Sequence, residues 1–243
     1  MDRLAPTRRP EGPPAGSHRW RTLLFLHWEV PVAALRALVP PRLSIDTFEG
    51  RAYLGLVPFT MEGIRPVRWL PPVPGVSAFH ETNVRSYVHL EGRDPGVWFF
   101  SLDAANAAAV VAARAGWNLT YFLARMSLER EADRIRYRSR RLYPPPTPAE
   151  LAIDWSIGEA RPPAAPGTLE HFLCERYLLY AARRDGTLLQ GQVHHTPYPL
   201  RGARVEGLRQ SLISAAGFEV TGDPVSVLYS PGVDVEVFGL KKV

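Results

Sequence analysis

Short apolar runs recur along this chain and are separated by clusters of glycine, proline and charged residues. This pattern is typical of β-strands joined by turns. A turn at residues 93–96 leads into one of these strands. Two further pairs of runs predict hairpins, 43–48 with 52–59 across Glu49-Gly50 and 177–182 with 188–194 across Asp185-Gly186. The remaining strands are predicted over residues 20–28, 79–90, 97–102, 134–142, 152–157, 225–229 and 233–238.

Helical signals are few and short. Pro31 precedes a predicted helix at 32–38, and an alanine-rich helix is predicted at 106–114. Thr168 is a suitable N-cap for a helix over 168–174, and residues 205–215 have helical spacing. Residues 119–128 fit either a helix or a strand. The predicted fold class is therefore α+β and β-rich, one mainly antiparallel barrel or sandwich with a few short helices.

The first eighteen residues differ from the rest. They contain four prolines, two glycines and three arginines and hardly any large apolar residue. We expect residues 1–18 to be a flexible N-terminal arm and residues 19–243 to be a single domain. Because this arm holds no apolar segment like that of a secretory signal, the expected location is cytoplasmic.

Composition excludes several classes of protein. Cys174 is the only cysteine, so an intramolecular disulfide framework and a multi-cysteine metal site are ruled out. No apolar run approaches the roughly 18 residues of a membrane helix, so no membrane association is expected. Of the 29 basic residues only Lys241 and Lys242 are lysines, which confines Schiff-base chemistry to the end of the chain. The net charge of +5 is compatible with anionic ligands.

Glu81, Asn83, Arg85 and Tyr87 form the densest row of polar side chains, at the two-residue spacing of one strand face. The alternation alone favours an ordinary exposed face. If the row lined the inside of a barrel, a carboxyl, an amide, a guanidinium and a phenol would converge on a ligand.

Two further clusters are weaker candidates. His194 and His195 are adjacent, so on a strand they point to opposite faces and cannot both ligate one metal without a kink; we expect no metal. The pattern favours a hydrogen-bonded or exposed histidine, and His195 as a single histidine facing a pocket is the alternative. A second row, on the strand 134–142, favours a solvated face with acidic partners over a nucleic-acid groove, so nucleic acid is an unlikely partner. That row consists of Arg134, Arg136, Arg138 and Arg140. No glycine-rich phosphate loop or dinucleotide motif is present, and no cofactor is expected.

A series of motifs resembles the YqjF-like family of uncharacterised proteins over roughly residues 20–240. Two positions depart from the family pattern, Thr120 in place of proline and Tyr198 in place of tryptophan. The motifs are Leu26-His27-Trp28-Glu29-Val30-Pro31, Gly50-Arg51-Ala52-Tyr53-Leu54-Gly55, Glu81-Thr82-Asn83-Val84-Arg85-Ser86-Tyr87-Val88, Trp98-Phe99-Phe100-Ser101-Leu102-Asp103 and His195-Thr196-Pro197-Tyr198-Pro199-Leu200.

That family is similar to the acetoacetate decarboxylase-like superfamily, and the resemblance implies a β-barrel or cone around a small pocket. In acetoacetate decarboxylase a lysine beside a second lysine attacks the substrate ketone. Aligning residues 114–126 with the corresponding segment puts Tyr121 and Phe122 at those lysines, and neither can form an imine. Glu81 resembles a pocket glutamate of the superfamily. The resemblance therefore implies a retained pocket without Schiff-base chemistry.

Three functions remain open at this point. The first is a pocket that binds a small carbonyl- or carboxylate-bearing molecule through Glu81, Asn83, Arg85, Tyr121 and His195. The second is a lysine-independent lyase, isomerase or hydratase that uses Glu81 with Tyr121 or His195. The third is binding of an anionic polymer along the Arg134–Arg140 row. The partner expected is a small-molecule ligand, and the sequence leaves a homo-oligomer open.

Overall fold

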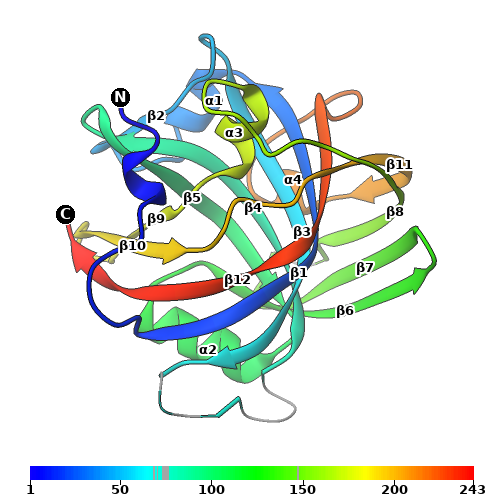
Figure 1. Cartoon of the computed structure of the whole chain (residues 1–243), viewed down its shortest axis with the longest axis horizontal. Helices are drawn as coiled ribbons and strands as arrows, with labels where there is room; N and C mark the ends of the chain where they lie inside the picture. Colours follow the sequence, from blue (N-terminus) through cyan, green and yellow to red (C-terminus); the bar gives the residue numbers. More distant parts are fainter. Residues whose placement is uncertain (68, 70, 73–76, 147) are drawn as a thin grey trace.

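The computed structural model describes residues 1–67, 69, 71–72, 77–146 and 148–243. Their strands form one large sheet and the helices are short (Figure 1). The strands are β1 (Gly16–Val30), β2 (Leu43–Ile45), β3 (Ala52–Arg65), β4 (Phe79–Leu90), β5 (Arg93–Ala104), β6 (Tyr121–Glu131), β7 (Arg134–Tyr143), β8 (Glu150–Ala160), β9 (Leu178–Ala182), β10 (Leu188–His194), β11 (Arg201–Gln210) and β12 (Ser226–Lys242). The helices are η1 (Ala5–Thr7), α1 (Val32–Arg36), α2 (Ala107–Gly116), α3 (Leu169–Cys174) and α4 (Leu212–Ala215).

The sheet closes on itself twice. In the first ring β12, β1, β3, β4, β5, β9 and β10 pair in sequence, and β10 pairs back onto β12. In the second ring β6, β7, β8 and β11 connect β5 to β12 by the other route. The strands β12, β1, β3, β4 and β5 belong to both rings. The predicted α+β, β-rich class is confirmed: the sheet is mainly antiparallel and ring-shaped, and the helices are few and short.

A strand shared by the two rings has both faces buried, because one face points into each ring. The core residues follow this division. On β1, Leu23 and Phe25 pack inside the first ring, whereas Leu24 and Leu26 pack inside the second. Such strands resemble continuous apolar runs rather than alternating ones, because neither face meets water. The exposed strands β6 and β7 alternate instead, as expected for a sheet with one solvated side.

Two helices lie at opposite ends of the first ring. Figure 1 shows α3 near the top of the molecule and α2 at the bottom. The Thr168 hydroxyl accepts a hydrogen bond from the His171 N–H at 3.3 Å, so the predicted N-cap of α3 is confirmed. Cys174 at the end of α3 is buried and free.

β12 passes so close to β1 that only glycine fits at one position. Gly232 has a φ of +135°, and a Cβ atom there would lie 2.1 Å from the Trp20 carbonyl oxygen. This position interrupts the apolar pattern between 229 and 233, which is why two strands were expected. The structure has one continuous strand there, β12.

The predicted hairpin at 43–59 is wrong in its pairing. Its turn exists, because the Phe48 and Arg51 backbones exchange both hydrogen bonds. However, β3 pairs with β4 only as far as Ser86, and β2 then continues along the same edge of β4, with Leu43 opposite Leu90.

Three other local predictions need correction or completion. The expected helix over 205–215 is β11 followed by α4. The turn before β5 lies at Glu91-Gly92, both at positive φ, rather than at 93–96, which belong to β5. Residues 119–128, left open between helix and strand, fall largely in β6.

The N-terminal segment makes specific contacts with the rest of the molecule. Arg3 pairs with the buried Asp46, and the Arg9 guanidinium lies 2.6 Å from Glu236. Pro6 is buried, and its carbonyl accepts a hydrogen bond from the Gln192 side chain at 2.9 Å. The division into an arm at 1–18 and a domain at 19–243 stays a prediction; β1 begins at Gly16.

Candidate functional site

The first ring encloses a cavity of about 330 Å³. Its walls come from the inward faces of β1, β3, β4 and β5 and from α2. The lining is mostly apolar, with polar side chains concentrated on β4 and at the start of β1. A mostly apolar hollow with a few placed polar groups is the usual form of a small-molecule site.

β4 places three members of the predicted polar row at this cavity. Glu81, Asn83 and Arg85 all line it, because alternate residues of a strand share one face. The intervening side chains face the second ring, where the Thr82 hydroxyl donates to Tyr137 at 3.0 Å. The exposed face that alternation alone favoured is therefore wrong: the row is buried from Glu81 to Tyr87. Tyr87 lies beyond the cavity, and its hydroxyl donates to the Leu173 carbonyl of α3 at 2.8 Å.

Glu81 is held by Tyr121, the first residue of β6. The Tyr121 hydroxyl donates to Glu81 Oε2 at 2.9 Å, and both side chains line the cavity. Burial raises the pKa of Glu81 to about 8, against the lowering effect of the Tyr121 hydrogen bond. Burial likewise raises the pKa of Tyr121 well above its ordinary value. At neutral pH the pair is thus a neutral acid and a neutral phenol.

The neighbouring residue on β6 faces the other way. Phe122 packs against Arg141, whose guanidinium carbon lies 3.6 Å from the ring centroid. Of the two positions that resemble the paired lysines of acetoacetate decarboxylase, only Tyr121 reaches the cavity. Lys241 and Lys242 are exposed at the end of β12, opposite Gln190 and Leu189 of β10.

The buried arginines differ in whether a carboxylate pairs with them. In the described part of the chain, Arg85, Arg141 and Arg176 are buried, at 8%, 2% and 8% exposure. Arg141 pairs with Asp103 at 2.7 Å and Arg176 with Asp46 at 2.9 Å.

Arg85, by contrast, forms no ion pair with any described residue. Its Nη2 donates to the Leu173 carbonyl at 3.1 Å, and its Nε is buried without a partner. A buried guanidinium without a carboxylate partner is costly, and this one lies on the cavity wall.

Two lining residues were missed by the sequence analysis. His18 and Trp20 project from the start of β1 and stack at 5.4 Å between ring centroids. His18 Nε2 and Trp20 Nε1 are buried without partners, as is Oδ1 of Asn83. Burial lowers the pKa of His18 to about 4, so its imidazole is neutral. The two-residue spacing of His18 and Trp20 was a usable signal, but the composition of the first eighteen residues indicated a loose arm.

His195 does not line the cavity. Its ring stacks on Tyr177 at 4.3 Å and lies 5.7 Å from Trp20, behind the wall. Its Nδ1 lies 2.7 Å from the Thr196 carbonyl, and burial lowers its pKa to about 4. The structure therefore brings together Glu81, Asn83, Arg85 and Tyr121 at the cavity. His195 lies outside the cavity lining, behind Trp20.

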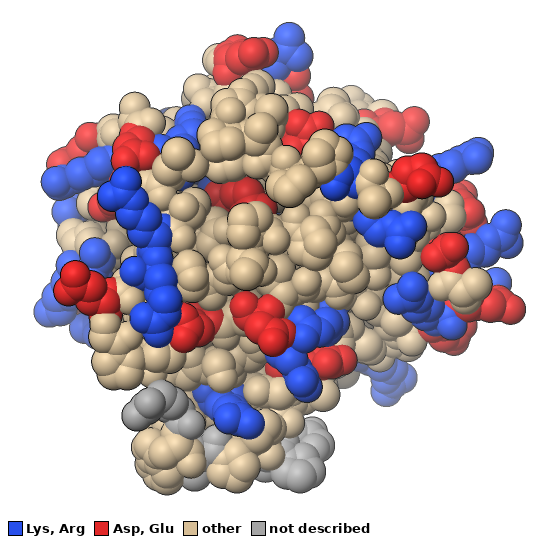
Figure 2. Space-filling model, viewed as in Figure 1, with Lys and Arg blue, Asp and Glu red and all other residues tan. Residues whose placement is uncertain are grey.

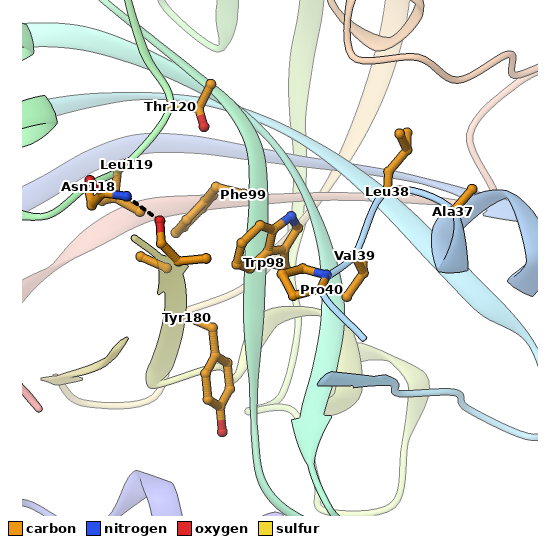
Figure 3. A pocket seen from close by; sticks show the side chains of 12 residues that line it. Ala37, Leu38, Val39, Pro40, Trp98, Phe99, Asn118, Leu119, Thr120 and Tyr180 are labelled. Atoms are coloured by element: carbon orange, nitrogen blue, oxygen red, sulfur yellow. Dashed lines mark hydrogen bonds between the residues drawn. The ribbon is translucent and has the colours of Figure 1, made fainter. Parts of the chain in front are cut away.

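A second hollow, of about 410 Å³, lies on the outer side of β5 and β9 (Figure 3). It shares Phe99 and Leu119 with the cavity of the first ring. Figure 3 shows Trp98 beside Pro40. The side-chain amide of Asn118 donates a hydrogen bond to the Ala182 carbonyl. Its lining includes no Asp, Glu, Lys, Arg or His, so it offers neither an ion pair nor acid–base chemistry near neutral pH.

The Arg134–Arg140 row is exposed on β7, and each arginine has a carboxylate nearby. Figure 2 shows acidic and basic side chains intermixed over this part of the molecule rather than a separate basic patch. The pairs are Arg134 with Glu206, Arg136 with Glu129, Arg138 with Asp154 and Arg140 with Glu150, at 3.9, 3.9, 2.6 and 3.4 Å. This geometry favours the solvated face.

Two features are absent among the described residues. No group of three or more histidine, cysteine, aspartate or glutamate side chains is placed to hold a metal ion. No helix there is both long and apolar enough to cross a membrane.

Comparison with known proteins identifies the family. The model of the DUF2071 family, described as an uncharacterized conserved protein, matches residues 17–234. The chain belongs to the DUF2071 family. It is 38% identical over 228 residues to the uncharacterized protein YqjF of Bacillus subtilis (strain 168), covering 92% of this chain and 90% of that one. The predicted YqjF-like resemblance is confirmed.

Solved structures place this DUF2071 member in the acetoacetate decarboxylase-like fold. The acetoacetate decarboxylase of Legionella pneumophila has a TM-score of 0.63 and 15% identity, covering 100% of this chain and 96% of that one. The enduracididine biosynthesis enzyme MppR, complexed with pyruvate, has a TM-score of 0.59 and 14% identity, with coverage of 97% and 93%. At these identities the likeness shows the fold alone.

Proposed function

We propose that the protein binds a small organic anion, carboxylate-bearing and able to carry a carbonyl, in the cavity of the first ring. The observation behind this proposal is Arg85, the one buried arginine of the described chain without a carboxylate partner. A ligand carboxylate would supply that partner through charge-assisted hydrogen bonds. Asn83 Oδ1, His18 Nε2 and Trp20 Nε1 would supply further polar contacts. A fold neighbour, MppR, is solved with a molecule of this class, pyruvate.

Calorimetric titration tests the proposal. Pyruvate and acetoacetate are compared with acetone, a neutral ketone, on the wild type and on Arg85→Gln. Arg138→Gln is the matched control, since it removes an exposed arginine. We expect Arg85→Gln to weaken carboxylate binding by about tenfold to a hundredfold, as for a lost hydrogen bond to a charged group. If Arg85→Gln and the wild type bind every carboxylate tested with equal affinity, or bind none, Arg85 is not an anion site.

A second candidate function is proton transfer without a lysine. Glu81 favours it, because a carboxyl with a pKa of about 8 exchanges protons near neutral pH. Ionised Glu81 would remove a proton from the carbon next to a ligand carbonyl and return it to the same carbon. Tyr121 would position the carboxyl. His195, one layer behind the wall, is less suited to this role than Tyr121.

Deuterium exchange measures this activity directly. In D₂O the wild type is expected to exchange the α-protons of a bound oxo acid, with a rate that rises up to about pH 8. Glu81→Gln removes the base and keeps the shape, so exchange falls to the background rate. An unchanged exchange rate in Glu81→Gln excludes this function and leaves the binding proposal standing.

A cytoplasmic location and the use of a small-molecule partner rather than nucleic acid belong to the same proposal. The carboxylates beside all four arginines of the Arg134–Arg140 row support the second part.

A further inference from the structure

The polar and apolar parts of the cavity are arranged along its length. Arg85 is the last residue of the β4 row to line it, and beyond Arg85 the space is filled by Tyr87 and α3. Both side chains hydrogen-bond the Leu173 carbonyl, which ties this end of β4 to α3. Arg85 therefore lies at a closed end of the cavity.

The other end of the cavity reaches the surface. Four of its lining residues are exposed: Ala15 before β1, Arg65 and Pro66 at the end of β3, and Ala112 of α2. Ala109, Ala112 and Ala113 line the cavity together, because residues three and four apart share one face of a helix. The mouth is therefore bordered by a helix face made of small side chains.

Between these two ends the walls are predominantly apolar. They are formed by Leu23, Val57, Phe59, Leu102, Leu179 and Val193. The volume, about 330 Å³, lies within the range of about 300–1,000 Å³ that holds drug-sized ligands. An acid of two or three carbons at Arg85 would leave most of this apolar wall without a contact.

We infer that the ligand is an amphipathic carboxylic acid that enters head-first, with its carboxylate at Arg85 and its apolar body extending along the cavity toward α2. This inference rests on the proposed function and adds to it the size, polarity and orientation of the ligand. Glu81 and Tyr121 would flank the body of such an acid partway along, where a carbonyl or hydroxyl substituent would meet the neutral Glu81 carboxyl.

A series of straight-chain acids tests the inference. Acetate, butyrate, hexanoate, octanoate and decanoate are titrated. The uncharged comparison is 1-octanol, which has the same number of carbons as octanoate. The affinity is expected to rise by about fourfold for each added methylene, which corresponds to about 0.8 kcal/mol, until the cavity is full. Arg85→Gln should weaken octanoate by about tenfold or more and leave 1-octanol unchanged. Binding of 1-octanol also shows that the variant is folded.

Substitutions on α2 test the direction of entry. Ala113→Leu enlarges a side chain at the open end and should weaken decanoate by about tenfold to twentyfold relative to hexanoate, since it displaces about two methylenes. Ala108→Leu is the matched control, because Ala108 is exposed on the same helix and does not line the cavity. It should leave every affinity unchanged.

Each result decides between the two proposals. If acetate and pyruvate bind as tightly as octanoate, and all depend on Arg85, the inference fails and the proposed function stands. If the affinity grows with chain length but Arg85→Gln weakens octanoate and 1-octanol equally, the head-first orientation is wrong. If Ala113→Leu and Ala108→Leu behave alike, the tail does not reach α2. If no acid binds in an Arg85-dependent way, the proposed function itself fails.

Discussion

Replacing Glu81 by glutamine should change how the stability of this protein depends on pH. The carboxyl has a pKa of about 8 in the folded protein and an ordinary value of 4.5. A carboxyl with a raised pKa stays protonated in the folded state while it ionises in the unfolded chain. Its effect on the free energy of unfolding is therefore most favourable below pH 4.5. That effect is lost as the pH rises to about 8.

The magnitude follows from the two pKa values. At about 1.36 kcal/mol for each tenfold change in proton affinity, the difference corresponds to about 5 kcal/mol. Glu81→Gln has no such dependence and keeps an acceptor for the Tyr121 hydroxyl. The variant should thus gain about 5 kcal/mol relative to the wild type between pH 4.5 and pH 8, and the difference should be constant outside that window.

Urea unfolding of both proteins at a series of pH values from 4 to 9 measures the difference. Other titrating groups are common to the two proteins and cancel. Glu219→Gln is the control, since Glu219 is exposed and the same charge is removed. A difference between Glu81→Gln and the wild type that stays constant within about 1 kcal/mol across the series would refute the reasoning, because it would mean that Glu81 is ionised in a hydrated cavity.

Three further predictions concern the scaffold and the chemistry. Arg141→Met should cost about 3–5 kcal/mol in the free energy of unfolding because it leaves Asp103 buried and unpaired, and adding Asp103→Leu should recover most of that loss. Gly232→Ala should unfold at a markedly lower temperature than the wild type, since a Cβ there would overlap the Trp20 carbonyl; an unchanged melting temperature would show that β12 and β1 are less closely packed. Borohydride treatment with acetoacetate should give no stoichiometric adduct by mass, because both lysines lie exposed at the end of β12; an adduct on either one would establish imine formation.

The candidate site was predictable where the alternation of one strand was unbroken. Glu81, Asn83 and Arg85 share a face because β4 runs regularly over them. Their burial was not predictable from the alternation, since a polar row on one face is also the pattern of a surface strand. The second ring behind β4 is what removes both faces from water, and it is assembled from strands far away in the sequence.

Local irregularities account for other errors. Val205, Leu208 and Leu212 have the spacing of a helix face, but Val205 and Leu208 belong to β11. Glu206 is an extra residue in β11, since Val205 pairs with Trp155 and Gly207 with the adjacent Asp154. Such a bulge shifts the alternation by one residue, so that two side chains three apart reach the same core.

The strands shared between the two rings determine which positions can be substituted in evolution without loss of the fold. The side chains that line the hollow of about 330 Å³ lack packing partners on one side. The filled second ring stabilises the same strands from behind. Along β4, odd-numbered positions from 81 to 85 face the hollow, and even-numbered positions face tightly packed side chains. Ligand preference can therefore diverge among homologues through the first set while the second set keeps the fold.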